Sequence, residues 1–351
     1  MDHARECIEK FYKPALPRKH PLTGQLTNEF QSLLSQAHAD LTPGECYFYH
    51  TMEFSAGEVS QGGWDFRGGE DKYLGFVDFQ GQKVLEFGPA SGFFSFYLES
   101  KGAEIVCFDI AVGAPPEQLS LPEVDLAAYL ESGAKIAKDT RNSWWYAHAK
   151  YNSKAKAVYG NIYDLPPDLG RYDVSTFGCI LLHLSNPFAV LSQAAAVTDK
   201  AIVVTELVKA PLDLESSYIE FHPGDRPRSP GNWWGLSPGS VAKMLTILGF
   251  PEISLNYHAQ KHRIDHDQAN PLIDVPLFTV VGEKSKYLLK RLNARTSNLE
   301  IQKSPDEQSL IDAAIRNEIL QHEIEALRSS TSWRLTQPIR TVADALKRWF
   351  G

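Results

Sequence analysis

The sequence contains few cysteines: four among 351 residues, and no two form a Cys-x-x-Cys pair. None lies near a histidine at zinc-finger spacing, so neither a disulfide framework nor a structural zinc site is predicted. Cys107 and Cys179 fall in apolar runs, where small buried thiols are expected. No group of His, Asp and Glu has the spacing of metal ligands, and we expect no metal.

Long apolar segments and an excess of basic charge are also missing. The N-terminus, Met1–Lys13, lacks the apolar stretch of a signal peptide, and no apolar run is long enough to cross a bilayer. The 35 Lys and Arg are outnumbered by 43 Asp and Glu, giving a net charge of -8. Because binding of polyphosphates needs clustered basic residues, nucleic acid is a poor candidate partner. A cytoplasmic enzyme is predicted.

The chain divides into three regions that differ in composition and in hydrophobic pattern. Residues 1–80 are rich in turn formers and are expected to form an N-terminal lid or substrate segment. Residues 81–285 alternate short apolar runs with helical patterns, which predicts a mostly parallel sheet with helices on both faces. Residues 286–351 are charged and have a helical period. Seven strands are expected in the middle region: Lys83–Phe87, Glu104–Phe108, Lys156–Tyr159, Tyr172–Phe177, Ala201–Glu206, Glu252–Tyr257 and Pro276–Val281.

The strongest local signal is a strand that leads through a glycine loop into a helix, in the sequence V-L-E-F-G-P-A-S-G of Val84–Gly92. Glycines let the backbone approach a ligand closely. Asp109 ends the next strand about 20 residues later, where a carboxylate can accept hydrogen bonds from both ribose hydroxyls. The loop and the acid together predict a nucleoside site at the carboxyl ends of the first two strands.

The kind of nucleoside follows from the loop itself. Its spacing is Gly-x-x-x-Gly rather than Gly-x-Gly-x-x-Gly, and Glu86 precedes the first glycine. A dinucleotide needs the loop and the helix terminus for its pyrophosphate. An acid at Glu86 instead suits a cationic ligand that bears an amino acid. We therefore predict S-adenosyl-L-methionine, rather than NAD, as the cofactor.

The run Glu86–Gly92 resembles motif I of the class I S-adenosylmethionine-dependent methyltransferases, usually E/D-x-G-x-G-x-G, with Ala90 in place of the middle glycine. Tyr172–Pro187 resembles motif IV and the helix after it. The resemblance covers about residues 45–283 and implies a Rossmann-like methyltransferase fold. Three further segments are similar to a bacterial subgroup related to the tRNA wobble-uridine methyltransferases: Tyr49–Glu53, Gly63–Asp65 and Asn232–Trp234.

This resemblance also implies which residues hold the cofactor. It implies a ribose contact for Asp109 and adenine contacts for Asn161 and Ile162. The loop, the strand ends and three aromatic residues complete the expected cofactor set: Glu86, Gly88, Pro89, Ala90, Ser91, Gly92, Phe93, Asp109, Ile110, Asn161, Ile162, Phe177 and Trp64.

Methyl transfer to a hydroxyl needs a general base, and His is the natural base near neutral pH. His183 follows the fourth strand, as a base or acceptor-binding group, or as a histidine packed at a helix edge. His222 lies in a turn-rich loop after the fifth strand, where an active-site or a surface position fits. His50 is expected either to line a lid over the methyl group or to make the polar contacts of a local turn. Glu206 is expected either to contact the substrate or to be a charged residue at the end of a strand.

Aromatic residues supply candidate walls for the acceptor. Of the adjacent Trp233 and Trp234, one is expected to face the acceptor, and Trp144–Tyr146 is a candidate lid. An aromatic wall suits a sugar ring or a nucleobase equally, so it does not distinguish the two acceptors.

The last region carries two further signals. Ser309–Arg328 has a short apolar stripe, typical of a coiled coil or of a helix folded back on the core. Ser329–Arg340 resembles a tail segment, S-x-S-W-R-L-T-x-P-x-R, that recurs at the ends of bacterial polysaccharide-assembly enzymes, including glycosyltransferases. Thr341–Phe350 is basic and amphipathic. It predicts contact with such a partner or with the inner-membrane surface, and a capping helix is the alternative.

Three functions remain open. The leading one is O-methylation of a sugar hydroxyl in a bacterial surface polysaccharide or its precursor, supported by the tail and the acidic charge. The second is methylation of a tRNA base, supported by the relatives of the core. The third is a non-catalytic scaffold in polysaccharide assembly, against which the intact Glu86, Gly88, Gly92 and Asp109 argue. We expect a glycan or a small molecule as the acceptor.

Overall fold

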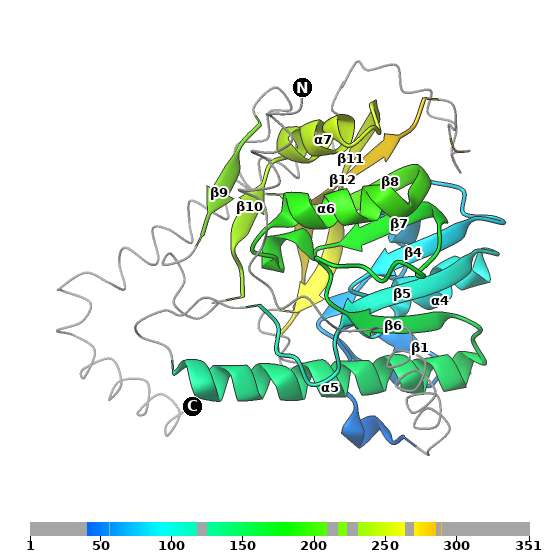
Figure 1. The fold of residues 1–351 in the computed structure, drawn as a ribbon. Coiled ribbons are helices and arrows are strands. Elements are labelled where there is room, and N and C mark those ends of the chain that lie inside the picture. Colours follow the sequence, from blue (N-terminus) through cyan, green and yellow to red (C-terminus); the bar gives the residue numbers. More distant parts are fainter. Residues whose placement is uncertain are drawn as a thin grey trace, which may run out of the picture.

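A computed structural model describes residues 41–55, 57–117, 125–208, 217–222, 231–263, 270–285 and 289. Within these ranges, a mixed sheet is covered by helices on both faces (Figure 1). The tail segments, Ser309–Arg328, Ser329–Arg340 and Thr341–Phe350, lie outside the described residues. None of the described helices has the length and apolarity needed to cross a membrane.

The sheet has eight strands in the order β3-β11-β12-β8-β7-β4-β5-β6. Strands β4 to β8 run parallel to one another, and β12 is antiparallel to both of its neighbours. Without β3, and counted along the chain from β4, the order is 3-2-1-4-5-7-6. The bounds are β3 Trp64–Asp65, β4 Lys83–Phe87, β5 Glu104–Ile110, β6 Lys156–Gly160, β7 Tyr172–Gly178, β8 Thr198–Leu207, β11 Glu252–Arg263 and β12 Leu272–Glu283.

This order confirms the predicted Rossmann-like class I methyltransferase fold. The chain winds outward from β4 in one direction to β5 and β6, and in the other to β7 and β8. The order therefore reverses at β4, and ligands of such sheets bind where it reverses, beyond the carboxyl ends of the strands. The predicted cofactor loop follows directly after β4.

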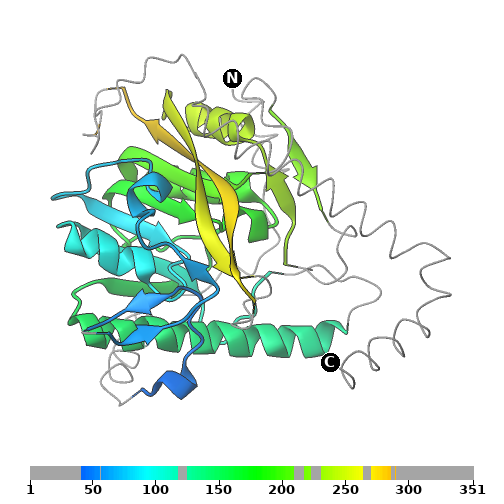
Figure 2. The ribbon, with the colours of Figure 1, turned by 180° about the vertical axis from the view of Figure 1, so that it is seen from behind.

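Each face of the sheet has its own hydrophobic core, because successive side chains of a strand point to opposite faces. Val84 of β4 packs with α4 (Phe93–Ser100) and with Trp144 of α5 (Leu126–Tyr151). Leu85, the next residue, packs with α6 (Pro187–Val197) and α7 (Pro238–Ile247). Figure 2 shows α4 and the N-terminal segment on the same side of the sheet. Both layers of helices that the sequence predicted are present.

The helix ends follow from their capping residues. Asp125 accepts a hydrogen bond from Ala128 N at the start of α5, and Asn186 does the same for Ala189 N in α6. Ser237 caps α7 through Ser240 N, as its Ser-Pro sequence predicted.

Trp144 and Trp145 of α5 are almost fully buried. The expectation that Trp144–Tyr146 forms a lid is therefore wrong: Trp144 and Trp145 belong to the core, and Tyr146 is buried against the N-terminal segment, where its hydroxyl donates to Glu58.

The N-terminal segment, residues 41–80, contains η1 (Pro43–Glu45), β1 (Met52–Glu53), β2 (Val59–Ser60) and α3 (Glu70–Tyr73), as well as β3. β3 pairs antiparallel with β11, so the sheet has eight strands rather than the seven predicted. Only two residues pair there, too few to leave an alternating pattern in the sequence.

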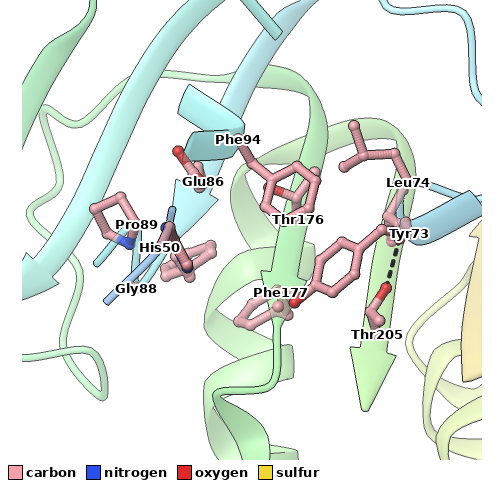
Figure 3. Close-up of a pocket in the computed structure, with 13 residues that line it drawn as sticks. His50, Tyr73, Leu74, Glu86, Gly88, Pro89, Phe94, Thr176, Phe177 and Thr205 are labelled. Carbon is pink, nitrogen blue, oxygen red and sulfur yellow. Dashed lines mark hydrogen bonds between the residues drawn. The ribbon is translucent and has the colours of Figure 1, made fainter. Parts of the chain in front are cut away.

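Buried polar groups fix this segment to the sheet. The hydroxyls of Thr205 and Thr279 donate to Tyr73 O at 2.7 and 3.0 Å, and Figure 3 draws the first of these bonds. Gln260 Nε2 donates to Gly69 O at 3.0 Å. The end of α3 is thereby held directly over β8 and β12.

Candidate functional site

A cavity lies at the carboxyl ends of β4 and β7, beneath the N-terminal segment (Figure 3). The predicted loop contributes Glu86, Gly88 and Pro89 to its lining, and β7 contributes Thr176–Gly178. His50 and Tyr73 line it from the N-terminal segment. Three regions that are far apart in the sequence therefore enclose the place where the fold predicts a ligand.

The loop after β4 has a backbone that requires glycine. Gly88, Ala90 and Gly92 all have positive φ, at 65°, 47° and 85°. A Cβ on Gly88 would lie 2.6 Å from Ile180 Cδ1, and one on Gly92 would lie 2.5 Å from a ring carbon of Phe96. Ala90, where motif I usually has glycine, keeps the same left-handed conformation at a cost of about 1–2 kcal/mol.

Ser91 joins this loop to its surroundings. Its hydroxyl accepts a hydrogen bond from Tyr49 N at 2.7 Å and another from the Ser143 hydroxyl at 3.0 Å. Tyr49 belongs to the N-terminal segment and Ser143 to α5. The middle of the loop is thus tied to both elements that cover it.

Glu86 is buried beside the cavity. Its Oε2 accepts hydrogen bonds from the Ser95 hydroxyl and, at 3.4 Å, from the Cys107 thiol. Burial raises the pKa of Glu86 to about 7, although these two hydrogen bonds oppose the shift. A cation bound nearby would favour the charged carboxylate. The site therefore fits the cationic amino-acid end of S-adenosylmethionine.

Asp109 lies near the end of β5, in the strand next to the loop. It is half-buried, and its Oδ1 accepts a hydrogen bond from Ile110 N at 2.8 Å. Burial raises its pKa, while the Ile110 amide and the charge of Arg141 oppose the shift. Arg141 is itself buried in α5, with its guanidinium over the Tyr159 ring at 4.9 Å. Sequence reasoning missed Arg141, because nothing distinguishes it from the other charged residues of a long helix.

Asn161 and Ile162 follow β6, as the resemblance requires for residues beside the adenine. Asn161 is exposed, and its side-chain oxygen accepts from Tyr163 N at 3.0 Å, which closes the turn after the strand. Ile162 is half-buried. Their position agrees with the expectation, and their contact with a cofactor stays a prediction.

The three aromatic residues of the predicted cofactor set pack mainly within the protein. Phe177 lines the cavity but is buried, and its ring stacks on Phe87 with centroids 4.5 Å apart. Phe93 begins α4 and contacts the ring of His50. Trp64 is not among the residues that line the cavity. Its ring stacks on Phe66 with centroids 5.4 Å apart, so Trp64 packs into the core from the edge strand β3.

His183 ends the short helix η2 (Leu181–His183), which follows β7. Its Nδ1 lies 2.8 Å from Gly231 O. Because a carbonyl oxygen only accepts, Nδ1 carries the hydrogen, and Nε2 of the neutral ring has the free lone pair. Desolvation lowers the pKa of His183, although the carbonyl bond opposes the shift. The side chain is exposed to solvent, so the lone pair on Nε2 can accept a proton from an incoming group.

His222 contacts the same short segment, residues 231–234, that supplies the carbonyl partner of His183. It follows β9 (Ile219–Phe221), which pairs with β10 (Trp234–Leu236) to form a two-stranded ribbon. His222 N donates to Trp233 O at 3.0 Å, and Trp233 N donates to Leu182 O at 2.8 Å. The structure thus connects both predicted histidine bases through residues 231–234. His222 Nε2 also lies 3.6 Å from a carboxylate oxygen of Glu220.

An aromatic pair extends from this ribbon. Phe221 is 55% exposed, and its ring centroid lies 5.0 Å from that of Trp234. Trp234 Nε1 donates to Leu184 O at 2.8 Å, next to His183. The exposed aromatic surface therefore lies close to residues 231–234, which contact His183, and the expectation that Trp233 or Trp234 faces the acceptor stays a prediction.

The other two candidates are buried. His50 lines the cavity, where its ring contacts those of Tyr49 and Phe66. Glu206, at the end of β8, is 2% exposed and accepts a hydrogen bond from Leu181 N at 2.8 Å. The contact between Glu206 and Leu181 could not be predicted from the sequence, since the two residues lie 25 positions apart.

In the part of the chain that the structure describes, no group of three or more His, Cys, Asp or Glu is placed to hold a metal ion. Cys46, Cys107 and Cys179 are free thiols.

No protein-family model matches the chain, and no curated protein does. Solved structures show weak likeness. The N-terminal domain of EvdMO1, crystallised with SAH and D-fucose, is 20% identical, with 72% of this chain and 96% of that one covered at a TM-score of 0.42. Magnesium protoporphyrin IX methyltransferase from Synechocystis is 12% identical, with 80% and 94% covered at 0.35. At these TM-scores, the function must be inferred from the residues of this chain.

Proposed function

We propose that this chain is an S-adenosylmethionine-dependent methyltransferase. One observation carries the proposal: the strained glycine loop, the buried Glu86 and Asp109 meet at adjacent strand ends, where the strand order reverses. A fold of this kind binds its ligand there. A scaffold with no ligand would have no need for a strained loop beside one buried and one half-buried acid.

Different residues of the site would bind different parts of the cofactor. Glu86 faces the cavity and suits the cationic amino-acid end. Asp109 suits the ribose hydroxyls, and Asn161 with Ile162 would border the adenine. When bound, S-adenosylmethionine supplies an electrophilic methyl group on a sulfonium. The chain's own task is then to hold the acceptor in line with that group and to remove a proton.

We further propose a sugar hydroxyl of a bacterial surface polysaccharide, or of its precursor, as the acceptor. His183 would take the hydroxyl proton on Nε2 while the acceptor oxygen bonds to the methyl carbon and the carbon–sulfur electron pair passes to sulfur. The exposed Phe221 beside Trp234 offers a ring face to a sugar. The net charge of -8 argues against a tRNA acceptor.

Two measurements test this proposal. Calorimetry of the full chain with S-adenosylmethionine should show binding, and absence of binding would contradict the function, as the scaffold alternative predicts. Mass analysis of surface glycan and of tRNA should then compare cells with and without the chain. Loss of one methyl group from the glycan supports the sugar acceptor. Loss from a tRNA base instead would establish the alternative acceptor.

The tail remains a proposal from sequence. Ser329–Arg340 and Thr341–Phe350 would bring the enzyme to a glycosyltransferase, to another polysaccharide-assembly partner or to the inner membrane, because they carry an apolar edge with positive charge. A cytoplasmic location fits such a role.

A further inference from the structure

The chain turns sharply where β7 gives way to the helix that carries His183. β7 ends at Gly178, and Cys179 follows with a φ of 50°, a left-handed conformation that is uncommon for a residue other than glycine. Cys179 N donates to Thr205 O at 2.8 Å. Such strain persists only where the surroundings hold it, and it is often found at functional sites.

Contacts on three sides hold this turn. Ile180 packs over Gly88 of the cofactor loop, so closely that a Cβ on Gly88 would collide with it. Leu181 N donates to Glu206 Oε1 at 2.8 Å. On the far side, Trp233 N donates to Leu182 O, and His183 Nδ1 donates to Gly231 O. The cofactor loop, β8 and residues 231–234 therefore all contact this one corner.

Glu206 is the only charged group among the contacts just named. It is 2% exposed, and a buried carboxylate must have hydrogen-bond donors. Leu181 opens η2, where a backbone N–H has no partner within the helix. A carboxylate there satisfies the amide through a charge-assisted hydrogen bond. Its burial and this contact argue against Glu206 as the group that touches the acceptor.

We propose that Glu206 is a positioning residue: by holding the Leu181 amide, it fixes η2 so that His183 keeps its hydrogen on Nδ1 and its lone pair on Nε2. The value of this arrangement for catalysis rests on the proposed function, in which His183 is the base. The arrangement itself does not depend on any cofactor. Because Ile180 lies on Gly88, the same corner also sets the base relative to the cofactor loop.

Two substitutions separate the hydrogen bond from the volume of the side chain. Glu206→Gln keeps an oxygen that can accept from Leu181 N. Glu206→Met has a similar length but no such acceptor. Long-range ¹⁵N correlation spectra of the full chain report the tautomer and the pKa of each histidine, and the His183 signals are assigned by their loss in His183→Gln.

The wild type should show the Nδ1–H tautomer, and Glu206→Gln should retain it. Glu206→Met should show a mixture of tautomers, with the pKa of His183 moved toward the ordinary value of about 6.5. An unchanged His183 in Glu206→Met would overturn the proposal. If that variant does not fold, hydrogen exchange of the Leu181 amide in the wild type decides: strong protection supports the proposal, and rapid exchange overturns it.

Calorimetry distinguishes this proposal from the proposed function. Glu206→Met should bind S-adenosylmethionine as the wild type does, since Glu206 lies outside the predicted cofactor set. If the wild type binds no S-adenosylmethionine, the proposed function fails, while the spectra still test the role of Glu206.

Discussion

The two halves of the carboxyl edge of the sheet are built in different ways. In the cofactor half, the loop and its acids come from β4, β5 and the turns directly after them. In the acceptor half, His183 is held by a carbonyl 48 positions away, and its short helix is held by a carboxylate 25 positions away. The first half follows from local sequence, and the second exists only once distant segments have met.

This difference predicts that substitutions will separate into two groups. Changes in the cofactor half should alter affinity for S-adenosylmethionine. Changes in the acceptor half should alter turnover and leave that affinity intact. Five experiments test this division, from the largest expected effect to the smallest.

Gly88→Val should reduce affinity for S-adenosylmethionine more than about a hundredfold, because its Cβ meets Ile180 and its φ of 65° is strained for a branched residue. Gly81→Val is the matched control: Gly81 has a φ of 72°, but nothing lies within 4 Å of its Cβ position. Thermal melts should show a lowered melting temperature in both variants, because both place a branched residue at a positive φ. Calorimetry should show loss of S-adenosylmethionine binding only in Gly88→Val. Equal binding by the two variants would contradict the site.

His183→Ala should lower maximal turnover about a hundredfold or more without changing cofactor affinity. Turnover is measured on the acceptor that the mass analysis identifies, with His222→Ala in parallel. The lowered pKa of His183 implies that wild-type activity persists somewhat below pH 6.5, and falls once the ring is protonated. Full turnover in His183→Ala, with loss in His222→Ala, would move the base to His222. Full turnover in both would leave His50 as the next candidate.

Asp109→Ala should weaken cofactor binding by about 1–3 kcal/mol, about tenfold to a hundredfold, through the loss of ribose hydrogen bonds. Calorimetry with S-adenosylmethionine measures it. Asp173→Ala, which removes a half-buried acid from the opposite end of β7, serves as the control for loss of a carboxylate. Wild-type affinity in Asp109→Ala would show that the ribose lies elsewhere.

Glu86 should make binding depend on pH. Its pKa is raised to about 7, so the folded chain holds a proton there that the unfolded chain releases near 4.5. Its contribution to stability therefore decreases as the pH rises through this interval. Binding of a cation needs the ionised form, so affinity should rise up to about tenfold from about pH 6 to about pH 8.

Calorimetry at several pH values measures this rise, and buffers of different ionisation enthalpy report the proton released. Glu86→Gln should bind more weakly and show a flat profile. A wild-type affinity that stays constant over this range would mean that Glu86 keeps its proton when the ligand binds.

Truncation after Gln302 should have the smallest effect on chemistry. The last strand among the described residues, β12, ends at Glu283, and the tail sequence offers neither a base nor a nucleotide-binding loop. The shortened chain should melt, bind S-adenosylmethionine and methylate a soluble acceptor as the full chain does. It should lose co-sedimentation with anionic vesicles or with a partner glycosyltransferase. Loss of folding would mean that the tail belongs to the core.

Much of the cofactor half could be predicted from the sequence. The strands before Gly88 and Asp109, the turn between them and the capped helices leave patterns that repeat every two or about 3.6 residues. The eighth strand was missed because two paired residues leave no such pattern. Tyr49 and Tyr73 were missed as site residues because the helices and strands of their segment are too short to leave a pattern, and because both lie far in the sequence from the cofactor loop.

By itself, then, the sequence determined the order of strands and helices and the chemistry of the loop, because both depend on neighbouring residues. Only the tertiary structure decided where each candidate side chain lies. It buried Glu206 against Leu181, turned Trp64 into the core and placed the hydrogen of His183 on Nδ1, facing Gly231 O. These outcomes depend on burial and on hydrogen bonds between distant segments, and a side chain acquires both only when the chain has folded.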